Sequence, residues 1–300
     1  MDALVVEQRR NGGFEARHRV HAVAVVGGAV VAEAGDGGLV CFMRSSSKPL
    51  QALPLARARD DLTRRDLAIA SASHRATPDQ IAAARDLLAR AEATEDDLEL
   101  GLQPGRPPEK IFHNCSGKHA GMLALCRARG WPTRGYRLPE HPVQQDCAEA
   151  HAEAAEAATG ELSTATDGCG VVTFALPLER MAHAYARFEQ LPDAARVADA
   201  MRAHPDLVGG PDGADYELMR SASGWFAKGG AEGLLCAAGP GPDGATVGIA
   251  LKSEDGAARP LGPALAAFLA PFGVALPSLE TVPVANSRGE RVGELVVTTS

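Results

Sequence analysis

The sequence predicts an α+β fold, in which strands from the N- and C-terminal parts form an antiparallel sheet packed with helices and the middle forms a mainly helical lobe. Three observations predict it. The first forty residues are rich in valine and alternate in polarity, the middle is rich in alanine at helical spacing, and the last third returns to short apolar runs between glycines. Strands that are segregated from helices favour an antiparallel sheet over an alternating βαβ fold.

The N-terminal strands are expected at residues 3–8, 18–26 and 29–35, because valine-rich alternating runs separated by Gly-Gly turns are typical of hairpins. Pro49 then opens a helix that begins just after Lys48, since proline suits the first turn. The run at 67–72 is either a short strand or the buried end of a helix. A further helix begins at Thr77, with the threonine as N-cap and Pro78 in the first helical position.

Four more helical segments are predicted in the middle of the chain. The apolar spacing after residue 115 predicts a helix that ends near Gly130. An alanine-rich helix over 143–159 is stopped by Gly160, and residues 164–188 are expected to be a glycine-rich loop followed by a helix, with Pro177 marking a kink or a restart. Another helix over 192–204 is closed by Pro205.

The last third predicts strands on either side of tight turns between residues 224 and 256, a short helix over 262–270 and a final strand over 291–300. We expect a single catalytic unit over 1–300. Its sheet lobe spans roughly 1–45 and 215–300, and its helical lobe spans roughly 46–214. A cleft between the two is the natural place for a site.

Composition excludes several classes of protein. The net charge of −8 argues against nucleic acid or an anionic membrane as partner, because both favour basic patches. No run reaches about 18 apolar residues, so no membrane span is expected. The six cysteines are sparse and no export signal precedes them, which favours reduced thiols in the cytoplasm. A small molecule is the expected partner.

Ser45 and Lys48 are the first candidates for chemistry. They stand three residues apart in "RSSSKPLQ", so on a helix both would lie on one face. A serine becomes a nucleophile only when a base takes its proton, and a neutral lysine can do so. Without the rest of the chain, Ser-x-x-Lys is a weak pattern that often occurs by chance, and a polar helix start is the more ordinary explanation.

Lys228 strengthens this hypothesis. "KGG" at residues 228–230 lies on a predicted strand late in the chain, where serine β-lactamases and penicillin-binding proteins carry a K-T-G-type triplet beside the Ser-x-x-Lys helix. A hairpin turn with a solvated lysine is the alternative. Ser73, at the rim of an apolar segment, could add a second hydroxyl to this network, while the neighbouring His74 is either a base or a simple polar contact.

The stretches "HNCSGKHAG" and "TDGCG" supply the remaining candidates. Cys115 and Lys118 have i, i+3 spacing, and Cys169 lies in a tight glycine loop. Two thiols with a lysine or histidine could hold a metal ion, although this is not a standard zinc spacing. Buried thiols that flank a ligand pocket are the alternative. His119 and Asp167 are better candidates as polar ligands for the charged ends of a substrate.

Several blocks together resemble the asparaginase II family, the rhizobial type of bacterial L-asparaginase. The blocks occur in order over nearly the whole chain: RSSSKPLQALPL, ASASH, HNCSGKHAGML, TDGCGVVTFALPL, MRAHPDLVGG and AKGGAEG. The resemblance implies a fold similar to serine β-lactamases and glutaminases, a homodimer, and hydrolysis of L-asparagine to L-aspartate and ammonia.

The resemblance also implies roles for single residues. It makes Ser45 and Lys48 the first Ser-Lys dyad and Ser73 and Lys228 the second. A zinc ion would be held by Cys115, Lys118 and Cys169, and it would not be required for the attack by serine. Arg44, His119 and Asp167 would line the substrate pocket.

Two other functions stay open at this point. One is another serine hydrolase of the same fold, acting on glutamine or on a β-lactam or peptide amide. The other is a non-catalytic module that binds amino acids through "HNCSGKH" and "DGCG". Ammonia release from asparagine, compared with turnover of glutamine and a chromogenic β-lactam, separates the three.

Overall fold

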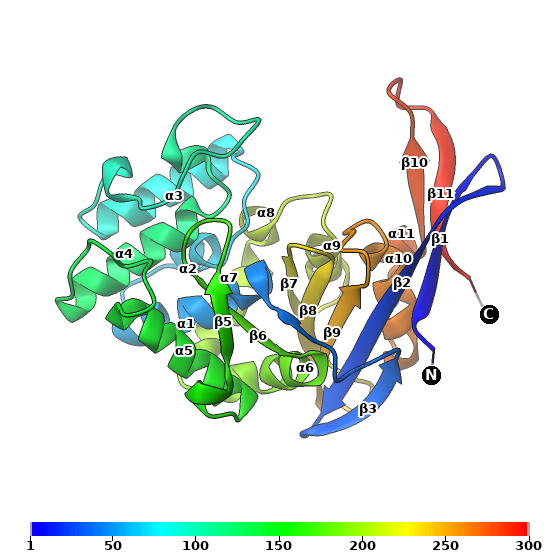
Figure 1. Ribbon diagram of the computed structural model, residues 1–300, viewed down its shortest axis with the longest axis horizontal. Helices are drawn as coiled ribbons and strands as arrows, with labels where there is room; N and C mark the ends of the chain where they lie inside the picture. Colours follow the sequence, from blue (N-terminus) through cyan, green and yellow to red (C-terminus); the bar gives the residue numbers. More distant parts are fainter. Residues whose placement is uncertain (1, 299–300) are drawn as a thin grey trace. The chain divides into compact units, whose positions relative to one another are not determined.

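The computed structural model describes residues 2–298, which form two compact units (Figure 1). The sheet unit comprises residues 2–41, 177–186 and 212–298, and the helical unit comprises residues 42–176 and 187–211. Each unit has its own buried apolar core. That both belong to a single catalytic unit stays a prediction.

The sheet unit contains an eight-stranded sheet built from both ends of the chain (Figure 1). Its order is β10-β11-β1-β2-β9-β8-β7, with β3 paired to β2 off this path, and its strand pairs are antiparallel. This confirms the predicted fold class. The strands are β1 (Leu4–Arg10), β2 (Gly13–Val26), β3 (Ala29–Ala34), β7 (Phe226–Gly230), β8 (Leu234–Pro240), β9 (Thr246–Ser253), β10 (Thr281–Ala285) and β11 (Arg291–Thr298). Residues 299 and 300 of the expected final strand lie outside the described residues.

Helices accompany the sheet in this unit: α6 (Leu178–Arg187), α9 (Ala214–Ser221), α10 (Leu261–Leu269) and α11 (Pro277–Glu280). Helix α6 lies directly on β9 at Gly248. A Cβ atom at this position would stand 2.1 Å from the carbonyl oxygen of Ala182 and 2.5 Å from the nitrogen of Ala186. Only a glycine therefore permits so close an approach of helix and strand.

The helical unit is arranged around α1 (Lys48–Ala58). Residues 48–56 are all buried, because α1 packs against α4, α5 and α7. A helix that is covered on every side belongs in a core. The other helices are α2 (Arg64–Ala70), α3 (Pro78–Arg90), α4 (Ser116–Arg129), α5 (Pro142–Ala155), α7 (Ala194–Ala203) and α8 (Pro205–Val208), with short 3₁₀ turns at Arg44–Ser47, Glu95–Asp97, Lys110–Phe112, Thr159–Glu161 and Phe188–Gln190.

Several predicted helix ends are confirmed. Thr77 caps α3 through its side chain, in a capping box with Gln80. Helix α4 ends at Arg129, and Gly130 follows in the left-handed conformation with φ of 68°. Helix α5 ends earlier than expected, because Glu156 rather than Gly160 adopts a left-handed conformation, with φ of 50°.

A second sheet, of three strands, differs from the expectation. Its order is β4 (Val40–Phe42), β6 (Val172–Pro177) and β5 (Ser163–Thr166). The sequence predicted a helix after the glycine loop at 167–170, but the run "VTFALP" is a buried strand, and the helix begins only after Pro177. Short apolar runs rich in valine, threonine and phenylalanine suit strands, and periodicity alone does not distinguish them from buried helix.

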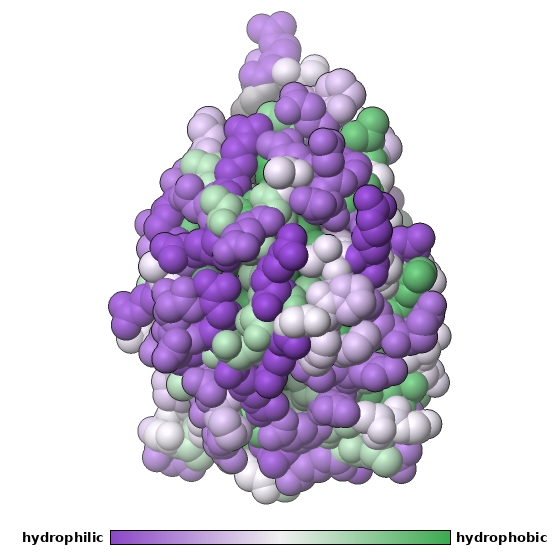
Figure 2. Space-filling model, turned by 90° about the vertical axis from the view of Figure 1, so that its left-hand side faces the viewer, coloured by the Kyte–Doolittle hydropathy of each residue, from purple (hydrophilic) through white to green (hydrophobic). Residues whose placement is uncertain are grey.

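The helical unit presents a mainly polar exterior. Figure 2 looks onto one side of the molecule and shows hydrophilic residues over most of it, with hydrophobic ones scattered between them. This is the pattern expected where helices turn their apolar faces inward. Within residues 2–298, no helix combines the length and the apolar character needed to cross a membrane.

Candidate active site

Ser45 lies in a tight turn between β4 and α1. The backbone N–H of Lys48 donates to the carbonyl of Ser45, which closes one turn of 3₁₀ helix. Side chains three residues apart in a 3₁₀ helix eclipse one another, so positions 45 and 48 lie on one side of the turn. Ser46 and Ser47 are fully buried, whereas Ser45 is partly exposed. Of the three serines, Ser45 is therefore the one that solvent reaches.

The turn carries backbone strain. Arg44 has φ of 49°, a left-handed conformation that a non-glycine residue rarely adopts. Its backbone N–H donates to Oγ1 of Thr173 on β6 at 3.2 Å, which holds the strained residue in place. Such conformations cost about 1–3 kcal/mol and cluster at functional sites.

Lys48 contacts Ser73 directly. Its side chain is fully buried, and its Nζ donates to Oγ of Ser73 at 2.8 Å and to the carbonyl oxygen of Ala72. The resemblance assigned Lys48 and Ser73 to different dyads. The structure instead joins these two side chains by one hydrogen bond.

His74 has a structural role. The hydroxyl of Ser116 donates to the carbonyl oxygen of Ile111 at 2.8 Å, so the ring Nε2–H must donate to Ser116 Oγ, at 2.7 Å. Nδ1 then accepts from the N–H of Ala76 at 3.2 Å. Burial lowers the pKa of His74 to about 3, which keeps the ring neutral. With both nitrogens engaged, His74 is a polar contact rather than a base.

Arg44 and Asp167 form an ion pair at 2.5 Å between Nε and Oδ1. The side chain of Asp167 is 9% exposed and that of Arg44 is 28% exposed, so the pair lies at the edge of the interior. Lys118 Nζ stands 4.0 Å from the other carboxylate oxygen. The loop that carries Asp167 is closed by hydrogen bonds from Asp167 N–H to Val171 and from Gly170 N–H back to Asp167.

The thiols of Cys115 and Cys169 form one cluster with Lys118. The Nζ of Lys118 lies 3.1 Å from Sγ of Cys169. Two effects hold the pKa of Cys169 well below its usual range: the hydrogen bond from Cys115 and the positive charge of Lys118. The same hydrogen bond between the two thiols raises the pKa of Cys115. Burial disfavours charge on Lys118, but the negative charge around it, that of Cys169 first, and its hydrogen bond to Cys169 together outweigh burial and raise the pKa of the lysine. The cluster is thus a thiolate–ammonium pair.

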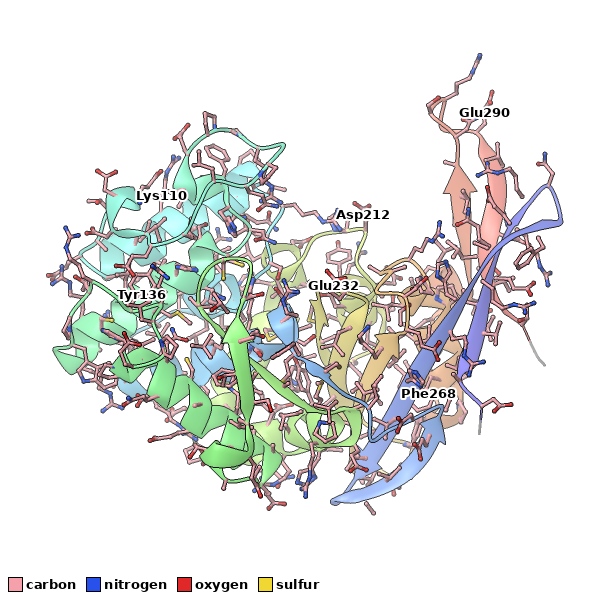
Figure 3. The ribbon with its side chains drawn as sticks, viewed as in Figure 1. Lys110, Tyr136, Asp212, Glu232, Phe268 and Glu290 are labelled. Carbon is pink, nitrogen blue, oxygen red and sulfur yellow. The ribbon has the colours of Figure 1, made fainter. Side chains whose placement is uncertain are left out.

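His119 lies next to this cluster and is held by Tyr136, a residue that the sequence did not single out (labelled in Figure 3). The phenol accepts from the N–H of Glu99 at 2.9 Å, so it donates to Nδ1 of His119 at 2.7 Å. Burial lowers the pKa of His119 and keeps the ring neutral. No sequence pattern marks Tyr136, because it follows a loop far from the motif that contains His119.

The residues predicted to hold zinc do not make up an ordinary zinc site. Zinc is bound in proteins by cysteine, histidine, aspartate and glutamate, and a catalytic site supplies three of them. Within residues 2–298, no three such side chains form a group that could hold a metal ion. Lys118 would have to be the third ligand, and lysine lies outside this set of ordinary zinc ligands. We derive no catalytic step through a metal.

Lys228 lies on β7 of the sheet unit, opposite Cys236 on β8. Its side chain is 2% exposed, and its Nζ stands 3.5 Å from Oδ2 of Asp215. It also donates to the carbonyl of Gly229 at 2.8 Å. The sequence predicted Lys228 but not its partner, since nothing in the pattern around Asp215 distinguishes it from a surface acid.

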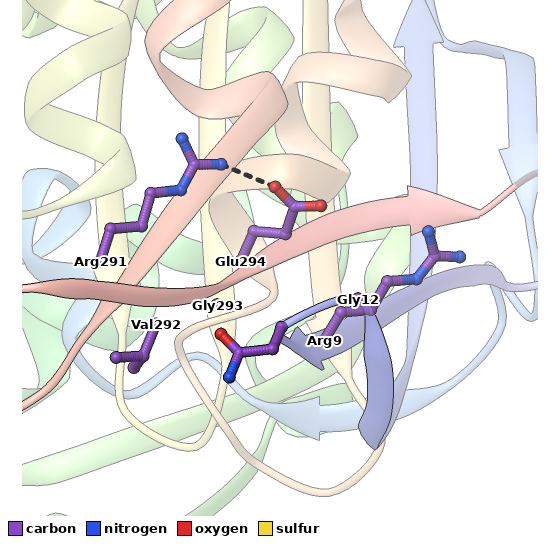
Figure 4. Close-up of a pocket in the computed structure, with 7 residues that line it drawn as sticks. Arg9, Gly12, Arg291, Val292, Gly293 and Glu294 are labelled. Carbon is purple, nitrogen blue, oxygen red and sulfur yellow. Dashed lines mark hydrogen bonds and ion pairs between the residues drawn. The ribbon is translucent and has the colours of Figure 1, made fainter.

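A pocket of about 250 Å³ on the sheet unit contains none of the predicted site residues (Figure 4). It lies beside the β1–β2 hairpin and β11. Both of its arginines are neutralised, Arg9 by Glu7 at 3.1 Å and Arg291 by Glu294 at 2.6 Å. Because none of the predicted site residues lines it, this pocket is not the candidate site.

Comparisons with known proteins identify the class and the family. The family model of L-asparaginase II matches residues 6–297. The chain is therefore an amidohydrolase and belongs to the L-asparaginase II family. No curated protein matches it in sequence.

Two solved structures are similar to this chain at low identity. A probable glutaminase from Bacillus subtilis, complexed with 6-diazo-5-oxo-L-norleucine, has 13% identity and a TM-score of 0.43, with 86% of this chain and 85% of that chain covered. A β-lactamase from Burkholderia ambifaria has 16% identity and a TM-score of 0.38, with 80% and 88% covered.

Proposed function

We propose that this amidohydrolase hydrolyses L-asparagine to L-aspartate and ammonia through Ser45. The observation that carries the proposal is Lys48, fully buried, one 3₁₀ turn from Ser45 and 2.8 Å from the hydroxyl of Ser73. Family membership supports asparagine as the substrate. A lysine can remove a proton only when neutral, and full burial favours that form.

Acylation transfers the proton of Ser45 to the leaving group. Oγ of Ser45 attacks the carboxamide carbon of asparagine, and Lys48 takes the hydroxyl proton. The carbon–nitrogen bond then breaks, and the proton passes from Lys48 to the nitrogen, which leaves as ammonia. Ser73, hydrogen-bonded to Lys48, lies where it can relay this proton.

Deacylation repeats these transfers with water. Water attacks the aspartyl ester, Lys48 takes its proton, and the proton returns to Oγ of Ser45 as the ester bond breaks. On the basis of the family resemblance, we assign Lys228 to the second Ser-Lys dyad, with Ser73. Backbone N–H groups stabilise the oxyanion, and that of Ser45 is our candidate for one of them.

The substrate's charged ends need partners of both signs. We assign the α-ammonium group to Asp167, and the α-carboxylate to Arg44 or His119. The ion pair of Arg44 with Asp167 supports this, because it keeps a carboxylate and a guanidinium side by side at the edge of the interior. Zinc at Cys115, Lys118 and Cys169 is not required for these steps, and elemental analysis of the purified protein would detect it.

The remaining expectations concern the whole protein. We propose a homodimer in the cytoplasm, without a nucleic-acid or membrane partner, on the basis of the family resemblance and the net charge of −8. Light scattering of the purified protein gives its mass in solution and tests the dimer.

Replacing Ser45 tests the proposal. In Ser45→Ala, ammonia release from asparagine should fall by about 10⁴-fold or more, as expected when a nucleophile is lost. Ser47→Ala is the matched control, because it removes a buried hydroxyl that makes no hydrogen bond in the structure. Retained turnover in Ser45→Ala would exclude this nucleophile. Faster turnover of glutamine or a chromogenic β-lactam would exclude asparagine as the main substrate.

A further inference from the structure

Strand β6 is attached to the turn that carries Ser45. The turn and residues 172–176 of the strand lie in the helical unit. The carbonyl oxygen of Phe174 accepts from the N–H of Met43 at 2.8 Å. At the next position along the chain, the N–H of Arg44 donates to Oγ1 of Thr173 at 3.2 Å. The two residues directly before Ser45 are therefore both held by β6.

The same strand also holds the helix that follows the turn. In α1, Nε2 of Gln51 donates to the carbonyl oxygen of Val172 at 3.3 Å. Gln51 lies three residues after Lys48, so Ser45 and Lys48 lie between two points of attachment to β6. The position of this segment in the helical unit is thus set from both of its ends.

Among these three contacts, that of Thr173 depends on the type of residue. Val172 and Phe174 contribute backbone carbonyl oxygens, which every residue possesses. Thr173 contributes a side-chain hydroxyl, and the residue is only 3% exposed. Without this oxygen, the N–H of Arg44 would lose its acceptor at a place where the strand shields it from water.

The contact matters because the backbone of Arg44 is strained. Its φ of 49° lies in the left-handed region, which residues with a Cβ atom adopt at a cost. Such conformations persist only where the surrounding structure fixes them. The side chain of Arg44 is fixed as well, by its ion pair with Asp167 in the loop between β5 and β6. One hairpin therefore holds both the backbone and the side chain of the residue before Ser45.

We infer that Thr173 is a positioning residue for the reaction, acting on Ser45 through the backbone of Arg44. This inference rests on the function proposed above, in which Ser45 is the nucleophile. The hydroxyl of Thr173 keeps Arg44 in its left-handed conformation, and this conformation sets the direction in which the next residue presents its Oγ. Without the hydroxyl, Arg44 relaxes toward a negative φ and Ser45 leaves the position needed for attack. A displacement of about 1 Å can lower a rate by about 10²-fold.

The test compares two substitutions of Thr173 in the whole protein. Thr173→Val keeps the branched shape and removes the acceptor, so kcat for ammonia release from asparagine should fall by about 10–100-fold while KM changes by less than about threefold. Thr173→Ser keeps the oxygen, and its kcat should stay within about threefold of that of the unmutated protein. Thr164→Val makes the same change at an exposed position of β5 and should leave both constants unchanged.

A role in stability alone gives a different result. Thr173→Val would then lower the free energy of unfolding in urea, but the folded enzyme would keep its kcat, and the inference would be wrong. An equal loss of kcat in Thr173→Val and Thr173→Ser would also refute it, because the methyl group rather than the oxygen would matter. A rise in KM alone would contradict an effect on the nucleophile.

Thr173→Cys carries the test if Thr173→Val does not fold. It differs from Thr173→Ser in one atom, a sulfur that accepts hydrogen bonds only weakly. Its kcat should fall below that of Thr173→Ser, and equal values would overturn the inference.

The two proposals fail separately. Full turnover of asparagine in Ser45→Ala would refute the serine mechanism itself. Loss of turnover in Ser45→Ala, together with an unchanged kcat in Thr173→Val, would refute only the role of Thr173.

Discussion

At the scale of single residues, the network around Lys48 depends on one hydroxyl that no local pattern defines. Ser73 follows α2, 25 residues from Lys48 in sequence, and the fold places its Oγ 2.8 Å from the lysine Nζ. The distance is that of a normal hydrogen bond between the two groups. A proton can therefore pass between Lys48 and Ser73 without rearrangement.

Removing this hydroxyl should slow the chemistry more than it weakens binding. In Ser73→Ala we expect kcat for ammonia release to fall by about 10²–10³-fold with KM nearly unchanged, since a proton relay acts in the transition state. Steady-state kinetics on asparagine measure both constants. Ser71→Ala is the control, because its hydroxyl donates to Leu67 within the same segment and should leave kcat close to normal. A rise in KM alone would contradict the relay.

The burial of a second residue, His151, makes the stability of the protein depend on pH. His151 is fully buried on α5, its Nδ1 lies 2.6 Å from the carbonyl oxygen of Cys147, and burial lowers its pKa to about 4. In the unfolded chain the pKa is about 6.5. Its contribution to stability is therefore complete above pH 6.5 and is lost as the pH falls toward 4, because only the unfolded chain takes up the proton in this range.

The unmutated protein and the variant His151→Leu should therefore differ in how their unfolding free energy depends on pH. Between pH 7 and pH 5 the group should cost the unmutated protein about 2 kcal/mol of unfolding free energy, and His151→Leu should lack that loss. Urea unfolding at both pH values measures it. Equal losses in the two proteins would mean that His151 becomes charged in the folded state near its ordinary pKa.

At the scale of elements, the close contact of α6 with β9 depends on Gly248. The contact is with backbone atoms, which cannot move aside as a side-chain end could. A methyl group at this position must push the helix from the sheet and open a gap in the core beneath it.

Gly248→Ala should therefore lower the unfolding free energy by at least about 2 kcal/mol. Chemical denaturation gives the value. Gly101→Ala is the matched control, since a Cβ atom there meets nothing within 4 Å and its backbone lies outside the left-handed region. If both variants were equally stable, the helix would have room to shift at no cost.

The elements that the sequence missed have identifiable reasons. Strand β10 contains Pro283, which argues against a strand, yet β10 is the outermost strand in the sheet order, where a missing N–H costs little. Strand β6 is a short apolar run whose sequence is equally compatible with a helix. Its antiparallel pairing with β5, which the sequence does not show, makes it a strand. Helix α9 is only eight residues long, too short for a clear periodic signal.

At the scale of the whole molecule, the sheet is assembled from the two ends of the chain. Strand β1 lies between β2 and β11, with Val5 opposite Thr298 (Figure 1). Residues 177–186, which include most of α6, belong to the same unit. The sheet is thus completed only when the last strand is made. Pairings over so long a separation cost loop entropy before they contribute stability, so we expect them to form late.

The sequence by itself determined the fold class, most of the elements and the chemical groups on which the proposed site rests. These follow from local patterns: the alternation of polar and apolar residues in strands, the helical spacing of apolar residues, the residues that cap helices, and the three-residue spacing of Ser45 and Lys48. The tertiary structure decided what the groups touch. It paired Lys48 with Ser73, Arg44 with Asp167 and Lys228 with Asp215, engaged both nitrogens of His74, and left Lys118 as the ammonium of an ion pair. Such partners lie far apart in sequence, and burial, which sets charge and protonation, exists only after the chain has folded.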